Sequence, residues 1–313
     1  MIRLSARRLV EAVLAVTVLL VLAVPPASAD WRAEMKVLRV GFLSGTGGAY
    51  RMAALEPFRA YLQAKLGLPV ELVPAGSYAA LIDAQASARV DYAIHSAASF
   101  ATAAASCGCV EPLALPSAAD GAKGYFSIVL ARADGNIHAL ADAKGARLAV
   151  AGADSIAGRL VPMKGFAREG IVPASYFAKI VETVAPDDAI GALLNGDADL
   201  AVGWSSLTGD AAAGYDFGVL ARMVADGRLD MTAVRVVWRS PLIPFGPHAV
   251  RTNLDPELKS LIRDALLAMA NEAPEALDAV DRSTDGGGGF VPADAGLYAA
   301  IADLVSEPAA GGH

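Results

Sequence analysis

Residues 37–74 read VLRVGFLSGTGGAYRMAALEPFRAYLQAKLGLPVELVP, and this stretch decides the fold class. Residues 37–43 are apolar and β-branched, which predicts a buried strand, and a glycine-rich loop follows at 44–48. Apolar residues at helical spacing predict a helix over 53–66, and a second strand follows at 70–74. A strand, a helix and a strand in this order form a β-α-β unit, so we expect the two strands to lie parallel in one sheet.

The rest of the chain repeats this alternation. Further strands are predicted at residues 90–94, 125–131, 146–151, 200–203 and 233–238, and further helices at 78–88, 99–105, 156–169, 189–195, 256–271 and 294–305. Such alternation predicts an α/β fold in which each sheet is mostly parallel and flanked by helices.

A chain of 313 residues is long enough for two domains, since domains typically hold roughly 100 to 200 residues. We expect a discontinuous first lobe, residues 36–127 and 242–307, and a second lobe, residues 128–241. The strands at 125–131 and 233–238 would lie near the lobe junctions and form a two-strand hinge on which the lobes close.

Residues 1–29 have the pattern of a secretory signal peptide. Arg3, Arg7 and Arg8 form a positive start, the apolar stretch at 12–24 is short for a bilayer span, and Ala27-Ser28-Ala29 supplies a cleavage site. An uncleaved membrane anchor fits less well because of that site and the two prolines before it. We therefore expect cleavage after Ala29 and export to the periplasm.

The chain is acidic, with a formal net charge of −7 at pH 7, and it becomes more negative if residues 1–29 are removed. An acidic protein is a poor partner for nucleic acid, which we exclude. An anionic ligand would need local positive potential, supplied by backbone N–H groups or by a well-placed arginine.

Two cysteines, Cys107 and Cys109, stand in a C-x-C pattern. Either a local disulfide or two structural thiols fits this pattern, and so short a bridge would stabilise the chain little. The sequence offers no second cysteine pair or histidine cluster, so we expect no metal and no cofactor.

Several segments carry a family resemblance over about residues 38–304. They are VGFL at 40–43, FRAYLQAKLGLPVELVPAGSYAALIDA at 58–84, VDYAIHSAASF at 90–100, RLVPMKGFAREGI at 159–171, RSPLIPFGPHAV at 239–250 and GGFVPADAGLY at 288–298. Together they resemble the PhnD-like group, the phosphate, phosphite and phosphonate binding proteins of ABC importers. The resemblance implies a two-lobed type II periplasmic binding protein fold, with the ligand held between the lobes at the carboxyl ends of strands.

The turn DSIAGR at 154–159 is the candidate ligand site of the second lobe, because it follows a predicted strand and opens a helix. Free N–H groups at a helix start suit an anion, Ser155 adds a hydroxyl, and Gly158 allows close backbone approach. An ordinary N-cap with nothing bound explains the same local pattern, and the resemblance favours the ligand site.

The same turn departs from the pattern of the group, which resembles Ser-Thr-Ser-Gly here. Ile156 and Ala157 stand in place of two hydroxyl residues. Asp187, or Asp188 if the match shifts by one residue, stands where the group tends to carry a histidine, and a carboxylate would prefer a hydroxyl, amide or ammonium group on the ligand. Arg159 could compensate by binding an oxyanion in a fork, or it could be a solvated arginine on the helix face.

Further candidates for ligand contacts follow predicted strands. Tyr78 matches the characteristic tyrosine of the group, although a lone aromatic residue more often packs in the core. Ser96 and Ser99 open a helix, where N-capping is the alternative role. Three more polar residues lie at strand ends, where turn chemistry or ligand contact explains them: Ser44, Thr46 and Ser205.

No motif indicates an enzyme. GWSSL at 203–207 lacks the second glycine of a nucleophile elbow, and GTGG at 45–48 lacks the spacing of a dinucleotide or phosphate loop. We therefore expect a monomeric periplasmic component of an ABC importer that binds a small polar or anionic solute, phosphonate-like or another oxyanion, and docks on an inner-membrane permease. A periplasmic sensor that feeds a membrane receptor or a histidine kinase would need the same two-lobed form, so the sequence leaves that alternative open.

Overall fold

The structure is a computed structural model that describes residues 31–44, 48–153, 155–281 and 287–306. The predicted signal peptide and Thr46 lie outside these residues. Residues 31–36 include a single helical turn, α2 (Trp31–Glu34), in which the Arg32 guanidinium lies 4.1 Å from the centre of the Trp31 ring. In the part of the chain that is described, no helix has the length and apolar character needed to cross a membrane.

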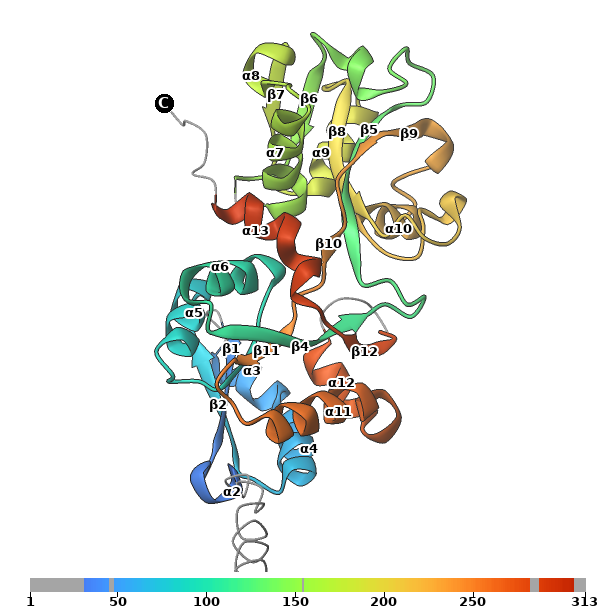
Figure 1. The fold of residues 1–313 in the computed structure, drawn as a ribbon. Coiled ribbons are helices and arrows are strands. Elements are labelled where there is room, and N and C mark those ends of the chain that lie inside the picture. The colour runs from blue at the N-terminus through green and yellow to red at the C-terminus, as the bar shows by residue number, and fades with distance from the viewer. Residues whose placement is uncertain (1–30, 45–47, 154, 282–286, 307–313) are drawn as a thin grey trace, which may run out of the picture. The chain divides into compact units, whose positions relative to one another are not determined.

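The first sheet holds strands in the order β12-β4-β11-β3-β1-β2 (Figure 1). Their bounds are β1 (Leu38–Leu43), β2 (Val70–Ala75), β3 (Tyr92–Ile94), β4 (Val110–Ser117), β11 (His248–Arg251) and β12 (Gly289–Pro292). Strand β1 pairs in parallel with β2 and β3, as the β-α-β pattern predicts. Strands β11 and β12 run antiparallel to their neighbours.

Helices cover this sheet, and their bounds are α3 (Gly48–Ala54), α4 (Glu56–Leu66), α5 (Tyr78–Ala86), α6 (Ala97–Cys107), α11 (Pro256–Glu272) and α12 (Pro274–Val280). Helix α4 buries Phe58, Leu62 and Leu66, which recur every fourth residue and so share one face. It ends at Gly67, whose φ of 62° is a left-handed conformation that suits glycine. The predicted helix at 53–66 is two helices, because Pro57 in the first turn of α4 has no N–H to continue the preceding one.

The second sheet has the order β10-β5-β8-β6-β7, with β9 paired to β5. Its strands are β5 (Gly124–Arg132), β6 (Arg147–Val150), β7 (Lys179–Glu182), β8 (Leu200–Ser205), β9 (Val234–Arg239) and β10 (Ile243–Pro244). The helices around it are α7 (Val161–Arg168), α8 (Pro173–Tyr176), α9 (Pro186–Leu194) and α10 (Val219–Ala225), and a π-helical turn at Ile156–Leu160 precedes α7. Buried apolar side chains cover both faces of β5 and β8.

The two-lobed α/β fold is thus confirmed, but the sheets are mixed rather than mostly parallel. The parallel pairs are β1 with β2 and β3, and β6 with β7 and β8. Strands that enter or leave a sheet at the crossings, such as β5 and β11, run antiparallel.

The chain passes between the sheets at residues 118–123 and 245–247, and these two segments lie together. The Phe245 N–H donates to the Lys123 carbonyl at 2.9 Å, and β10 pairs with the start of β5. A last helix, α13 (Ala299–Ser306), packs on α6, and its Asp303 lies 3.5 Å from Arg168 of α7. Backbone pairing and one ion pair therefore accompany the passage between the sheets.

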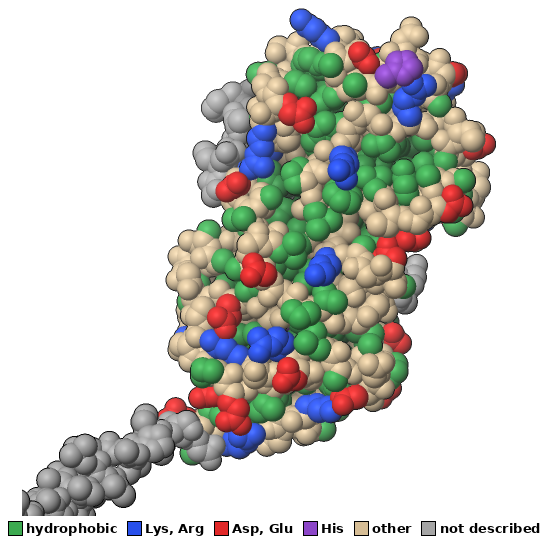
Figure 2. Space-filling view, turned by 45° about the vertical axis from the view of Figure 1, so that its right-hand side comes forward, with side chains coloured by type: hydrophobic (Ala, Val, Ile, Leu, Met, Phe, Trp, Pro, Cys, Tyr) green, Lys and Arg blue, Asp and Glu red, His purple; other side chains and the backbone are tan. Residues whose placement is uncertain are grey.

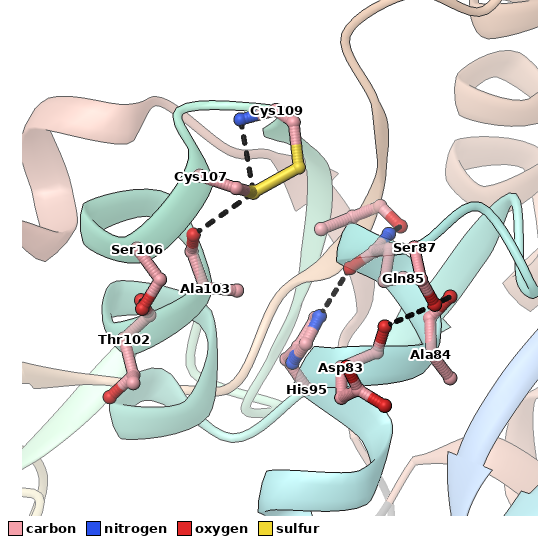
Figure 3. Close-up of a disulfide and its surroundings, with 11 residues drawn as sticks. Asp83, Ala84, Gln85, Ser87, His95, Thr102, Ala103, Ser106, Cys107 and Cys109 are labelled. Atoms are coloured by element: carbon pink, nitrogen blue, oxygen red, sulfur yellow. Dashed lines mark hydrogen bonds between the residues drawn. A yellow bond between two sulfur atoms is a disulfide. The ribbon is translucent and has the colours of Figure 1, made fainter.

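The C-x-C pattern is a disulfide that joins Cys107, the last residue of α6, to Cys109 just before β4 (Figure 3). The helix ends at Gly108, whose φ of 57° is again left-handed. The bridge therefore closes the end of α6 locally. Among the described residues, no group of three or more His, Cys, Asp or Glu side chains could hold a metal ion.

Gly246 should be required at the second crossing. A Cβ atom there would overlap the His95 carbonyl oxygen and lie 2.8 Å from Ser96 Cα, and backbone atoms cannot swing away. We expect Gly246→Ala to lower the free energy of unfolding by about 1–3 kcal/mol, measured by urea denaturation. The matched control is Gly191→Ala in α9, where the added methyl meets open space and alanine is the better helix former by about 0.5–1 kcal/mol. Equal effects of the two substitutions would contradict the packing argument.

Candidate ligand-binding site

A cavity of about 710 Å³ lies between the two sheets and is lined by residues from both. Phe42 and Ile94 line it from the carboxyl ends of β1 and β3, which is where open α/β sheets bind ligands. Figure 2 shows hydrophobic side chains gathered across the middle of one face of the molecule, with single Lys and Arg side chains among them. The cavity can therefore hold a small molecule between two walls of different origin.

The first wall includes the start of α6. Ser96 caps this helix: its hydroxyl accepts from the Ser99 N–H at 3.1 Å, and the Ser99 hydroxyl accepts from the Ser96 N–H at 2.9 Å. Ser96, Ala97 and Ala98 line the cavity, whereas Ser99 is buried behind them. The first N–H groups of a helix have no partner within it, so this wall presents donors and the positive end of the helix dipole.

The second wall includes the π-helical turn that precedes α7. Ser155 caps it by accepting from the Gly158 N–H at 3.1 Å, and Ser155, Ile156 and Ala157 line the cavity. Gly158 is buried behind them, where a Cβ atom would lie 2.6 Å from both Ala151 Cβ and Ser155 Oγ. Packing of this turn against Ala151, the residue after β6, therefore explains the glycine.

Aromatic side chains extend the second wall. Tyr125 of β5 meets Trp204 of β8 edge to face, with ring centres 5.2 Å apart, and Phe245 lies 6.0 Å from Tyr125. All three line the cavity, and Tyr78 at the start of α5 lines it from the first lobe with 41% of its surface exposed. Burial raises the pKa of Tyr125, with a smaller contribution from the Tyr78 phenol. The two phenols therefore face the same space.

Two buried histidines form part of the lining. His95 contacts Ser99 Oγ through Nδ1 at 3.0 Å and Gln85 Oε1 through Nε2 at 2.7 Å (Figure 3 shows the Gln85 contact). His248 is hydrogen-bonded to the Tyr92 hydroxyl. Burial lowers the pKa of His95 to about 4, and burial together with the neighbouring His95 lowers that of His248 to about 3. Both rings are therefore neutral at neutral pH.

Arg51 of α3 is the charged side chain among the described residues that line the cavity, and it is half-buried. Sequence reasoning missed it, because it follows a glycine-rich loop and belongs to no motif. It also missed the two histidines and the aromatic residues Tyr125 and Phe245. The signal that could have found these is their place at strand ends or at the crossing.

Several predicted site residues lie outside this lining. The Arg159 guanidinium pairs with Glu182 at 2.7 Å, and Asp187 pairs with Arg228 at 3.3 Å in a separate hollow beside α9. The Asp188 carboxylate accepts from the Ala185 N–H and caps α9.

Two predicted hydroxyls are hydrogen-bonded to backbone groups. The Ser44 hydroxyl donates to the Ala75 carbonyl, and the Ser205 hydroxyl accepts from the Leu207 N–H. A ligand contact from any of these residues stays a prediction.

Comparison with known proteins gives consistent matches. Residues 42–298 match the family described as "ABC transporter, phosphonate, periplasmic substrate-binding protein". The chain is 29% identical over 227 residues to the phosphate-import protein PhnD of Mycolicibacterium smegmatis, a match that covers 70% of this chain and 67% of that protein. A binding protein of a phosphonate ABC transporter from Pseudomonas aeruginosa is 25% identical, with a TM-score of 0.51, over 86% of this chain and 85% of that one.

A second solved structure shows likeness of fold alone. It is a protein from Xanthomonas citri solved with bound ATP, and it is 21% identical with a TM-score of 0.60. The match covers 87% of this chain and 97% of that one. The two chains therefore share the two-lobed fold although their sequence identity is low.

The neutral histidines should make stability depend on pH. In the unfolded chain they take up protons near pH 6.5, whereas the folded protein resists protonation down to about pH 4. The free energy of unfolding should be highest above pH 6.5. It should fall as the pH drops towards 4, by roughly 1.4 kcal/mol per pH unit for each of the two buried histidines. We expect His95→Gln to reduce this slope, measured as the free energy of unfolding at several pH values.

The exposed His138 provides the control for this prediction. His138→Gln removes an exposed histidine and leaves both buried neutral rings in place, so the pH dependence that these two rings cause should remain. A slope for His95→Gln equal to that of His138→Gln would contradict the assignment.

Proposed function

Because the chain belongs to the family of periplasmic substrate-binding proteins of phosphonate ABC transporters, we propose that it captures a small anionic solute in the cavity between its lobes. The family serves transport through a small-molecule ligand and a membrane permease, and it works in the periplasm. On this proposal the chain acts by binding rather than catalysis, as a monomer that presents its liganded form to the permease.

The observation that carries the proposal is the electrostatic character of the cavity. The chain is acidic overall, yet the described residues that line the cavity include no Asp or Glu. Arg51 and the starts of two helical segments face the space instead. Positive potential from a guanidinium and from helix N–H groups favours an anion over a neutral or cationic solute.

The proposed contacts are shared between the lobes. Ser96, Tyr78 and the N–H groups at the start of α6 would hold the ligand from the first lobe, and Ser155 with the amides of Ile156 and Ala157 would hold it from the second. With lobes at residues 36–127 plus 242–307 and at 128–241, closure about the two crossings would complete these contacts only when ligand is present. The signal peptide would direct export and would be removed by cleavage after Ala29.

The test is a carboxylate placed in the cavity. Ala98 is the second residue of α6 and lines the cavity, so Ala98→Glu should suit the helix dipole while repelling an anion. The purified chain from Asp30 is screened by thermal shift against phosphate, phosphite, methylphosphonate, phenylphosphonate, benzenesulfonate and benzoate. An anion at a hundredfold its Kd should add about 2.7 kcal/mol of stability. Ala98→Glu should weaken the binding of that anion by roughly tenfold or more.

Ala174→Glu is the matched control, because Ala174 is the second residue of α8 and is exposed. It adds the same charge at the same helical position, away from the cavity lining, and should leave affinity unchanged. The proposal is overturned if no anion raises the melting temperature, or if the two variants bind the anion equally well.

A further inference from the structure

Oxyanions need several hydrogen-bond donors, and the two serine hydroxyls that line the cavity are already engaged within the protein. The Ser96 hydroxyl is engaged with the Ser99 N–H and hydroxyl, and the Ser155 hydroxyl accepts from the Gly158 N–H. The adjacent lining positions, Ile156 and Ala157, carry no hydroxyl. A small oxyanion surrounded on all sides would leave some oxygens facing apolar atoms, which is unfavourable for a desolvated charge.

Apolar surface is abundant in the same place. Tyr125, Trp204 and Phe245 form a connected aromatic wall, with ring centres 5.2 Å and 6.0 Å apart. Ile156 and Ile243 border the wall. Flat apolar groups bind such walls by stacking and by removal of apolar surface from water. A ligand with no apolar body would leave this surface unused.

One side chain of the first lobe brings a positive charge to the cavity. Arg51 lines the cavity from α3, and the two lining histidines are neutral because they are buried. A guanidinium presents a planar fork that matches the oxygens of a phosphonate, sulfonate or carboxylate group. One charged group and one wide apolar wall suit a ligand with one charged end and one apolar end.

We propose that the ligand is an organic anion with an aromatic or similarly flat apolar body, whose charged group pairs with Arg51 and whose body lies on Tyr125, Trp204 and Phe245. This inference rests on the proposed function and narrows it, because it excludes inorganic oxyanions and methylphosphonate as preferred ligands. Arg51, rather than Arg159, is the specificity-determining cation, since Arg51 lines the cavity and Arg159 lies outside the lining.

Isothermal titration with two phosphonates tests the apolar body. Methylphosphonate and phenylphosphonate have the same charged group and differ in the group that would lie on the wall. We expect phenylphosphonate to bind at least roughly tenfold more tightly, because its ring is removed from water. Equal affinity, or tighter binding of methylphosphonate, would overturn the inference while leaving anion capture intact. Failure of every anion in the thermal-shift panel would overturn the proposed function itself.

Two arginine variants test the charged end. Arg51→Gln should weaken the binding of phenylphosphonate by at least roughly tenfold, because a charge-assisted contact is lost. Arg89→Gln is the control, because Arg89 is 61% exposed, pairs with Asp83 and does not line the cavity. Both substitutions change the net charge equally, so an equal effect on the Kd would remove Arg51 from the site. The melting temperature of each variant without ligand establishes that it is folded.

Discussion

The site depends on how closely the two crossing segments approach the first sheet. Phe245 is held from two sides, since its N–H donates to Lys123 and its carbonyl accepts from the Tyr298 hydroxyl at 2.9 Å. The next residue, Gly246, lies against the backbone of His95 and Ser96 with no room for a side chain. A single short segment therefore sets the positions of the α6 start, a neutral histidine and the aromatic wall together. Close packing of backbone on backbone leaves few alternatives to this arrangement.

The cavity has a local positive potential, whereas the whole chain carries a net negative charge. Carboxylates near the second wall are paired outside the lining: Glu182 with Arg159, and Asp187 with Arg228. The net negative charge would slow the approach of an anion, whereas the guanidinium and helix N–H groups act at short range. Selectivity then comes from a partly desolvated site in which each such contact is stronger than in water.

Much of the fold follows from local patterns, and the site follows from them only in part. The β-α-β unit at 37–74 and the serines that cap α6 and the π-helical turn could be predicted, because strand periodicity and capping are local properties. The direction of the crossing strands could not, since periodicity carries no information on pairing. Arg159 and Asp187 were reasonable candidates by position, but each pairs with an opposite charge, Glu182 of β7 and Arg228 in the loop after α10. Arg51 has no local signal, and only tertiary structure places it in the cavity.

The absence of hydroxyls at positions 156 and 157 is better understood as part of a surface than as two lost contacts. Ala157 packs with Val161 and Ile243, and Ile156 and Trp204 pack against the same cluster, so the apolar turn continues the aromatic wall. An oxyanion surrounded by such a wall loses about 1–3 kcal/mol for each oxygen left without a donor. An apolar body in the same position gains about 25 cal/mol for each Å² removed from water. The same residues therefore disfavour one class of anion and favour another, and specificity is the difference between the two.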